Sequence, residues 1–238
     1  MTPFDAVYII NLPSRTDRRE EMTRELTRVG IDPAAPDIVF FDAVRPADAG
    51  GFPSIGTRGC FMSHLGVLKA ARDAGHGRIL ILEDDLNFNR DFRQDYATVE
   101  PLLHDSPWGM AYLGYLALTP PVHSKERLFT LAPSTTVSAT HMLAFDAGII
   151  PALIAYLEAM LARPAGHPEG GPMHVDGAYS WFRRAHPDVR TVLCIPELGY
   201  QRPSRTDIHE LKWFDKTPVV RDVVALIRRS RARAAAQG

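Results

Sequence analysis

The chain has 238 residues, of which 45% are hydrophobic, and its formal net charge is -1. That length and composition can bury a sizeable core, and one large domain is the simplest expectation. The near-neutral charge argues against a nucleic-acid-binding protein, because such domains are usually strongly basic. The two cysteines, Cys60 and Cys194, belong to no CxxC motif or Cys/His cluster, so we expect neither a disulfide framework nor a structural zinc site.

The first residues carry no targeting pattern. The chain opens with Met-Thr-Pro-Phe-Asp, without the basic and apolar regions of a secretory signal. No apolar run approaches the ~20 residues that span a bilayer. We therefore expect a cytoplasmic protein with reduced thiols.

The first third of the chain alternates strand and helix patterns. The apolar residues 6–10 predict a strand, residues 16–29 a helix ending at Gly30, and residues 38–41 a second strand. Arg15 and Arg18 lie at the start of this helix. They fit either a solvated helix face with local ion pairs, which the residues alone favour, or a phosphate-binding turn.

A Pro/Gly-rich loop, residues 46–56, precedes a helical pattern over residues 65–72 that ends near Gly75. His64 stands at the head of this helix, and a lone histidine is more often structural than catalytic. The uninterrupted apolar run 79–82 then predicts a fully buried central strand.

Three carboxylates, Glu83, Asp84 and Asp85, follow that strand directly. Adjacent acids repel one another at the end of a buried strand, and a divalent cation with oxygen ligands would offset their charge. In open α/β sheets, ligands collect outside the carboxyl ends of the strands. The alternative is a strand that runs out into a solvated acidic loop, and the motif alone leaves both interpretations open.

The second half has several short strand patterns before its helices. We predict helices over 91–103 and 149–161 and from residue 174, and strands over 110–116, 127–131, 140–145 and 189–195. Residues 163–172, rich in Pro and Gly, are a candidate lid. This order predicts a nucleotide-binding α/β half merged with a mixed-sheet half. There is no Rossmann glycine fingerprint, P-loop or nucleophile elbow.

Three segments stand in a fixed order: YIINLPSRTDRR at 8–19, GCFMSH at 59–64 and ILEDD at 81–85. Together they resemble glycosyltransferase family 25, in which an INL-x-x-R-x-DRR opening precedes GC-x-x-SH and then LEDD. This family includes bacterial lipooligosaccharide galactosyltransferases and the collagen galactosyltransferases. The segment ending in Asp176 is similar, more loosely, to a later VD element of the family.

The resemblance implies an A-type glycosyltransferase fold: one α/β/α domain with a Rossmann-like nucleotide half, a mixed central sheet and an acceptor half. It also implies a UDP-hexose donor, a saccharide or glycolipid acceptor, and Mn²⁺ or Mg²⁺ as cofactor. The donor-binding residues would be Asn11, Leu12, Arg15, Arg18, Ser63, His64, Glu83 and Asp84. Asp85, assisted by Glu83, would ligate the metal. Arg202 and Arg205 either close over the same phosphates or are surface arginines.

The acceptor hydroxyl must lose a proton as it attacks the anomeric carbon, and a carboxylate opposite the leaving diphosphate can take it. The metal-binding acids lie on the leaving-group side, so the base must come from the second half. Asp176 follows the candidate lid and opens a helix, which makes it our candidate base of an inverting transfer. The alternatives are a plain helix N-cap for Asp176, or His174 or His141 as base.

Two other classes of function stay open. A metal-dependent nucleotide-sugar hydrolase or nucleotidyltransferase would use the same acids, but it gives no reason for the Asn-Leu-Pro-Ser-Arg element. A non-catalytic sugar-nucleotide-binding module is the second. For a transferase of this family, we expect a role in cell-surface polysaccharide or lipooligosaccharide synthesis.

We assign residues 1–217 to a single glycosyltransferase domain and residues 218–238 to a basic C-terminal helix. That segment has an apolar stripe at helical spacing, with arginines around and after it. Such a helix can lie on an anionic membrane, which would make the protein peripheral to the inner membrane face. The alternative is an ordinary terminal helix docked on the domain.

Overall fold

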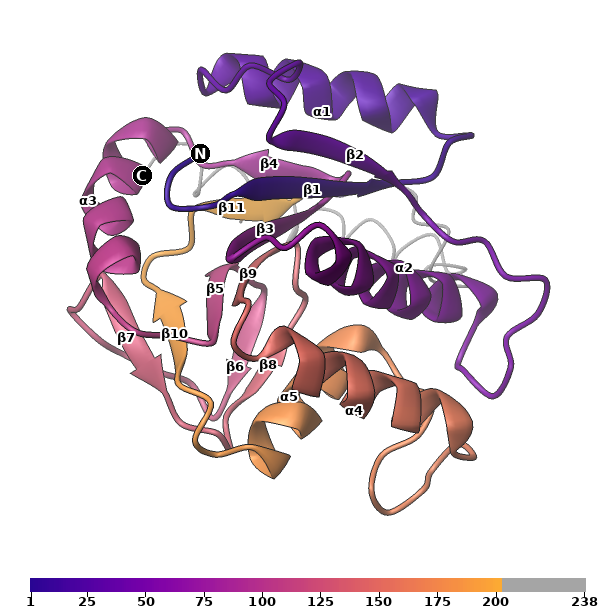
Figure 1. Ribbon diagram of the computed structural model, residues 1–238. Helices are drawn as coiled ribbons and strands as arrows, with labels where there is room; N and C mark the ends of the chain where they lie inside the picture. Colours follow the sequence, from indigo (N-terminus) through magenta and orange to yellow (C-terminus); the bar gives the residue numbers. More distant parts are fainter. Residues whose placement is uncertain (203–238) are drawn as a thin grey trace, which may run out of the picture.

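The computed structural model describes residues 1–202 of the chain (Figure 1). The predictions for Arg205 and for the basic C-terminal segment lie outside the described residues. The strands are β1 (Ala6–Asn11), β2 (Ile38–Asp42), β3 (Arg78–Glu83), β4 (Leu86–Phe88), β5 (Met110–Gly114), β6 (Ala117–Thr119), β7 (Leu128–Leu131), β8 (Thr136–Ser138), β9 (Met142–Asp146), β10 (Thr191–Cys194) and β11 (Gly199–Gln201). The helices are α1 (Thr16–Arg28), α2 (Ile55–Asp73), α3 (Phe92–Asp105), α4 (Ile150–Ala162) and α5 (Val175–Ala185).

Seven strands form one mixed sheet in the order β2-β1-β3-β9-β5-β10-β7. Strand β1 pairs in parallel with β2 and β3, and β5 pairs in parallel with β10. Strand β9 runs antiparallel between β3 and β5, and β7 is an antiparallel edge strand. The expected combination of a parallel, Rossmann-like half and a mixed half is therefore confirmed. The parallel strands β1, β2 and β3 end at one edge of the sheet.

The sheet is the middle of three layers (Figure 1). Tyr8 and Ile81 belong to a core shared with α2, α4 and α5, whereas Ile9 and Leu82 belong to a second core shared with α1 and α3. Successive residues of a strand point to opposite faces, so an uninterrupted apolar run is what a sheet covered on both faces requires. This explains why β1 and β3 were predictable.

Helix α2 lies against the loop that follows β2. Ser54 caps the helix by accepting a hydrogen bond from the Thr57 N–H at 3.0 Å. A Cβ atom added to Gly59 would lie 2.6 Å from the Val44 carbonyl oxygen, so only glycine allows this approach. Ser63 Oγ accepts a hydrogen bond from the Val44 N–H at 2.8 Å. Two residues of the GC-x-x-SH motif thus fix the position of the helix.

Four short strands were not predicted, namely β4, β6, β8 and β11, each of three residues. A three-residue strand is too short to show a periodic pattern. Helix α2 also begins at Ile55, inside the stretch predicted to be loop, because the cap at Ser54 initiates it. Pairing of β4 with β11 sets Gln201 opposite Leu86, which brings the end of the described chain to the acidic turn.

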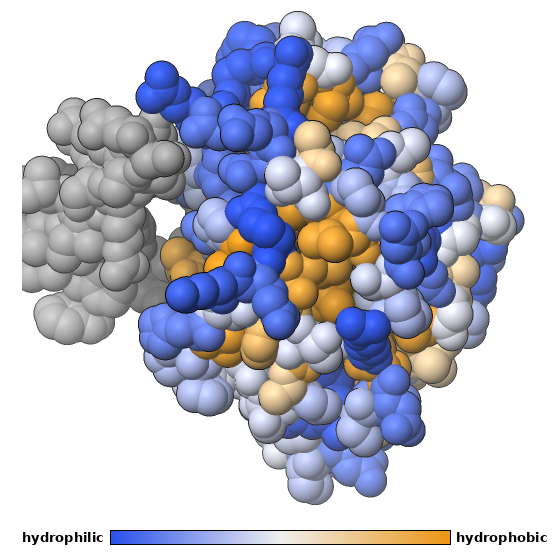
Figure 2. Space-filling view, turned by 90° about the vertical axis from the view of Figure 1, so that its left-hand side faces the viewer, coloured by the Kyte–Doolittle hydropathy of each residue, from blue (hydrophilic) through white to orange (hydrophobic). Residues whose placement is uncertain are grey.

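Figure 2 shows the side of the molecule that is on the left in Figure 1, where α3 and β7 lie. Apolar residues gather in the middle of this face between hydrophilic borders. Leu102 of α3 is a large apolar residue with 40% of its surface exposed. Among the described residues, no helix has the length and apolarity needed to cross a membrane.

Candidate active site

The acidic turn after β3 is held by the first strand-to-helix unit. Asp84 is buried and receives hydrogen bonds on both carboxylate oxygens, from Arg18 Nη1 at 2.7 Å and from Asn11 Nδ2 at 2.8 Å. Asn11 ends β1 and Arg18 lies in the first turns of α1. The Asn11 and Arg18 positions of the family motif therefore meet the acidic motif at one point in space.

Asp85 is 3% exposed and lies beside Asp84. Gln201 Nε2 donates to its two carboxylate oxygens at 3.2 and 3.3 Å, and Arg18 Nη1 lies 3.5 Å from Oδ2. Burial, together with the negative charge of Glu83, raises the pKa of Asp85 to about 7. A positive charge bound nearby would therefore stabilise the ionised form of this carboxyl.

Glu83 ends β3 and connects two groups of residues. Its Oε2 lies 3.4 Å from Gln201 Nε2, on the side of Asp85, and its Oε1 lies 3.7 Å from His64 Nε2. Burial raises the pKa of Glu83, but the nearby rings of His64 and His141 and the Arg18 guanidinium outweigh it, so the pKa lies below its ordinary value. We conclude that Glu83 is an ionised carboxylate.

The Arg18 guanidinium lies against Asp84 and Asp85, and the His64 ring lies beside Glu83. Buried negative charge of this kind needs compensation, and oxygen donors suit Mg²⁺ or Mn²⁺. Asp84 is held by short contacts of 2.7 and 2.8 Å, whereas the contacts of Asp85 with Gln201 are longer, at 3.2 and 3.3 Å, so Asp85 and Glu83 are the residues that would hold the cation. The donor set fits the metal that the family resemblance implies.

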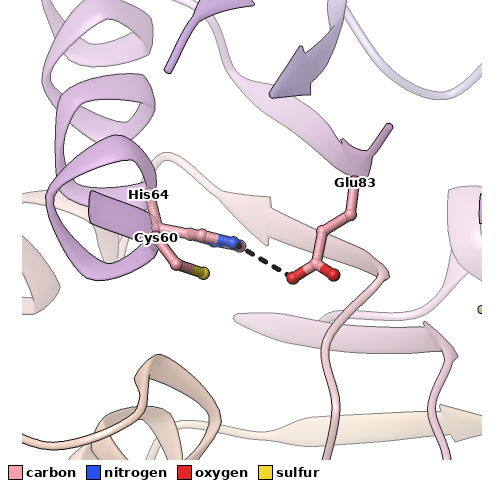
Figure 3. Close-up of side chains that lie close together, drawn as sticks. All are labelled: Cys60, His64 and Glu83. Atoms are coloured by element: carbon pink, nitrogen blue, oxygen red, sulfur yellow. Dashed lines mark ion pairs between the residues drawn. The ribbon is translucent and has the colours of Figure 1, made fainter. Parts of the chain in front are cut away.

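His64 joins this site to α5. Its ring is fully buried, and Nδ1 lies 3.0 Å from the Tyr179 hydroxyl. Cys60, one helical turn before His64 on α2, points its sulfur toward the same carboxylate (Figure 3). One ligand atom each of Cys60, His64 and Glu83 lies within 4.8 Å of the others. The sequence analysis did not predict this grouping.

Asp176 is the second residue of α5, and His174 occupies the N-cap position. Asp176 is therefore not the N-cap residue of α5, which was one alternative for its role. Asp176 Oδ2 accepts a hydrogen bond from the Ala139 N–H at 3.0 Å, and Oδ1 accepts one from the Gly177 N–H at 2.7 Å. Ala139 has a φ of 59°, a strained value for a residue other than glycine. The carboxylate thus holds a strained turn just before β9.

Asp176 lies in the same electrostatic field as the acidic turn. Burial raises the pKa of the Cys60 thiol, and the charges of Glu83, Asp176 and Asp85 raise it further. Carboxylates from both halves of the chain therefore interact electrostatically with the Cys60 thiol. His141, one of the alternative bases, is 1% exposed, and its Nε2 donates to the Gly199 carbonyl oxygen at 3.0 Å. Burial lowers the pKa of His141.

Other predicted donor-binding residues have local partners. Arg15 pairs with Asp17 through two contacts of 2.9 Å, which is the local ion pair that the residues alone favoured. Ser63 donates to the Gly59 carbonyl oxygen at 2.7 Å. Leu12 is half-buried next to Asn11, after the end of β1. Their contacts with a donor stay predictions.

Arg202 belongs to the acidic turn. Its Nη2 donates to the Asp84 carbonyl oxygen at 2.6 Å and lies 3.2 Å from Glu21, while its backbone N–H donates to the Asp85 carbonyl oxygen. The guanidinium is therefore anchored beside the site, and its closing over phosphates stays a prediction. Arg205 lies beyond the described residues.

Gln201 and Tyr179 are site residues that the sequence patterns did not predict. Gln201 reaches the acids only through the pairing of β11 with β4, which no local pattern signals. Tyr179 looked like one of the aromatic residues of an amphipathic helix. Its position three residues after Asp176, on the same face of a helix, is the signal that could have drawn attention to it.

The mixed sheet, with paired acids at the carboxyl edge of its parallel half, is that of an A-type glycosyltransferase fold. Residues 52–143 match glycosyltransferase family 25 (LPS biosynthesis protein). The three ordered motifs extend this likeness to the N-terminal strand and helix. Over these residues the chain is similar to glycosyltransferase family 25.

Several relatives are similar to part of the chain. The chain is 33% identical over 132 residues to procollagen galactosyltransferase 1-A of Xenopus laevis, covering 47% of this chain and 21% of that protein. It is 30% identical over 138 residues to the inactive glycosyltransferase 25 family member 3 of Homo sapiens, covering 49% and 23%. A putative glycosyltransferase of Acanthamoeba polyphaga mimivirus is 30% identical over 146 residues, covering 55% and 44%. The matches thus span less than half the length of each relative.

Among solved structures, the chain is similar to a glycosyltransferase involved in the glycosylation of the major capsid of PBCV-1. The identity is 12%, the TM-score is 0.48, and the match covers 84% of this chain and 94% of that one. It is also similar to a 4-diphosphocytidyl-2C-methyl-D-erythritol synthase of Anaerococcus prevotii, with 12% identity and a TM-score of 0.43 over 86% and 75% of the two chains. At this level of likeness neither structure bears on substrate or mechanism.

Proposed function

We propose that this protein transfers a hexose, with galactose the first sugar to test, from a UDP-sugar to a hydroxyl of a saccharide or glycoconjugate. The observation that carries the proposal is the meeting of Asn11, Arg18 and three carboxylates at the carboxyl edge of the sheet, with more negative charge than Arg18 offsets. The galactosyltransferase names of the relatives support the choice of sugar. The family description favours a role in lipopolysaccharide or other surface-polysaccharide synthesis, with the cytoplasmic membrane face as the expected place of work.

The acidic turn is the donor end of the proposed site. Asp85 and Glu83 would hold Mn²⁺ or Mg²⁺, which when bound would supply a Lewis acid for the charge on a leaving diphosphate. Asn11 and Arg18 bind Asp84, and so they position the turn that carries Asp85. Arg15 stands at the N-terminus of α1, where helix dipole and guanidinium together favour a phosphate.

Asp176 is the proposed base at the acceptor end. An ionised carboxylate has about four acceptor sites, and the backbone N–H groups of Ala139 and Gly177 occupy two of them. A remaining site takes the proton of the acceptor hydroxyl. The hydroxyl oxygen then forms its bond to the anomeric carbon as the bond to the diphosphate breaks, and the diphosphate leaves with the bonding electrons. This displacement inverts the anomeric configuration.

Replacing Asp176 tests this role. Asp176→Asn keeps an acceptor oxygen but cannot take a proton, so we expect the transfer rate to fall about 10²–10⁴-fold, with donor binding and folding unchanged. The matched control is Asp188→Asn, an exposed residue after α5, which should keep the parent rate. A rate above about a tenth of the parent's for Asp176→Asn would exclude it as the base, because a general base contributes more than that. Retained anomeric configuration in the product would exclude the inverting mechanism.

Replacing Asp85 tests the metal. UDP at about 100 times its dissociation constant should add about 2.7 kcal/mol of apparent stability to the parent when Mn²⁺ is present. Asp85→Asn should lose this Mn²⁺-dependent gain in a thermal-unfolding assay, while it stays folded and at least as stable as the parent without metal. If Asp85→Asn responds to UDP and Mn²⁺ as the parent does, the metal assignment is wrong.

A non-catalytic sugar-nucleotide-binding module is the second candidate. The relative named as an inactive family member supports it. Saturable binding of UDP with no turnover of any donor, in the presence of a broad set of acceptors, would favour this candidate over transfer. Release of free sugar at the same rate with and without acceptor would instead favour a hydrolase.

A further inference from the structure

Cys60, His64 and Glu83 bring three different ligand types to one point. Cys60 and His64 are four residues apart on α2, so they share one face of the helix. Glu83 approaches them from the end of β3 (Figure 3). The sulfur, one imidazole nitrogen and one carboxylate oxygen all lie within 4.8 Å of one another. No role for Cys60 follows from the proposed sugar transfer.

The imidazole gives independent evidence for a ligand. His64 is 0% exposed, and among the described residues its Nε2 has no hydrogen-bond partner. This nitrogen faces Glu83 Oε1 at 3.7 Å, too far for a hydrogen bond. Leaving a buried polar atom unsatisfied costs free energy, and native structures rarely do so without a reason. A cation between the nitrogen and the carboxylate would bind both.

The other ring nitrogen is already fixed. His64 Nδ1 lies 3.0 Å from the Tyr179 hydroxyl, and Tyr179 is itself fully buried. Histidines that ligate a metal nearly always bind a second group through the other nitrogen, which sets the ring orientation and the tautomer. In the neutral tautomer in which Nδ1–H donates to the Tyr179 hydroxyl, the lone pair of Nε2 is available to a cation on the side of Glu83.

The surrounding charge also favours a cation. Glu83, Asp176 and Asp85 all place negative charge near the Cys60 sulfur. A divalent cation gains from this negative charge, and on binding it displaces the thiol proton to solvent, so the sulfur coordinates as a thiolate.

We propose that Cys60, His64 and Glu83 form a binding site for a thiophilic divalent cation of the Zn²⁺ class. Thiolate, imidazole and carboxylate are the three ligand types that Zn²⁺ takes, and three protein ligands leave a fourth position open. Sulfur and nitrogen disfavour Mg²⁺ and suit later transition metals. The site differs from the oxygen-ligand site at Asp85 and shares only Glu83 with it. It does not depend on sugar transfer.

The test uses Co²⁺ as a spectroscopic probe on the full-length, reduced protein. We expect a saturable thiolate-to-cobalt charge-transfer absorption that one equivalent of Zn²⁺ removes by displacement. Cys60→Ser should abolish the band. The matched control is Cys194→Ser, which replaces the other cysteine, buried in β10, and should keep it. Asp85→Asn should also keep the band, which separates this proposal from the metal site of the proposed function.

Binding of Zn²⁺ by titration calorimetry tests the ligand geometry. Tyr179→Phe removes only the hydroxyl that orients His64, and we expect about 10–100-fold weaker binding, as for other such partners of metal-bound histidines. Absence of a charge-transfer band in the parent protein would overturn the proposal, whether or not any variant folds. A band that persists unchanged in Cys60→Ser, or that Cys194→Ser abolishes, would overturn it equally.

Discussion

At the scale of single residues, the contact that organises the site is the buried pair of Arg18 and Asp84. Only 10% of each side chain is exposed, so each would be a buried charge without the other. Asn11 completes the coordination of Asp84. The sequence pattern alone favoured a solvated helix face for Arg18. Its ion pair with Asp84 shows that Arg18 is instead part of the buried site.

We predict that Arg18→Met destabilises the protein by about 3–5 kcal/mol, because it leaves the Asp84 charge buried and unpaired. Urea unfolding measures the change. The control is Arg24→Met on the same helix, where both partners of the ion pair are largely exposed and the loss should stay within about 0.5 kcal/mol. Adding Asp84→Asn to Arg18→Met should restore part of the lost stability. Equal effects of Arg18→Met and Arg24→Met would contradict the account.

The raised pKa of Asp85 predicts a pH dependence of stability. The carboxyl binds its proton more tightly in the folded protein, with a pKa of about 7, than in the unfolded chain, where it is about 3.9. The metal-free protein therefore loses stability as pH rises from about 4 to about 7. The asparagine of Asp85→Asn would not titrate in this range. The stability of Asp85→Asn relative to the parent should therefore increase from about pH 4 to about pH 7 and stay constant above that.

Thermal unfolding of both proteins in chelator, from pH 4 to 8, measures this difference. A difference that stays constant with pH would show that Asp85 is not held in the environment described. Adding Mn²⁺ above pH 7 should reduce the stability difference between Asp85→Asn and the parent. The cation offsets the negative charge of Asp85 in the parent, and the variant has no such charge to offset.

At the scale of elements, α2 connects the motifs. Gly59 permits its close approach to the loop after β2, Ser63 binds that loop, and His64 reaches the end of β3. The sequence predicted the helix from its apolar spacing, but not its start at Ile55, which depends on the Ser54 cap. The tight packing at Gly59 depends on a neighbour that is distant in sequence, so no local pattern reveals it.

We predict that Gly59→Ala destabilises the protein by about 1–3 kcal/mol, as overpacking does, although alanine is the better helix former by about 1 kcal/mol. The reason is the 2.6 Å separation between the added Cβ and the Val44 carbonyl oxygen. The control is Gly177→Ala in α5, where the Cβ would meet only the flexible Met173 side chain at 3.3 Å. If Gly59→Ala and Gly177→Ala have the same denaturation midpoint, the close approach at Gly59 does not determine the stability of the protein.

At the scale of the whole molecule, the fold class and much of the site could be predicted from the sequence. The apolar runs of β1 and β3 and the acids after β3 are local patterns, and they define the nucleotide half. What could not be predicted depends on long-range pairing. Strand β11 pairs with β4 to deliver Gln201, and α5 packs on α2 so that Tyr179 meets His64. Neither contact leaves a periodic signal in the chain.

The arrangement of the sheet gives the two ends of the proposed site. Strands β1 and β3 bring Asn11 and the acids to one edge, and antiparallel β9 starts at that edge, because the Glu83 N–H donates to the His141 carbonyl oxygen at 3.1 Å. The strained turn at Ala139, which Asp176 holds, lies just before β9. Asp176, the proposed base, is therefore tied to the strand that starts at the edge carrying Glu83 and Asp85, the proposed metal ligands.

Sugar transfer is tested by following UDP release and product formation with UDP-galactose, Mn²⁺ and a set of saccharide acceptors. We predict that UDP release depends on the acceptor and that one glycosylated product forms for each UDP released. The transfer rates of Asp85→Asn and Asp176→Asn should both be at least about 10²-fold below the parent rate. UDP release that is equally fast without any acceptor, or full transfer by either variant, would contradict the account.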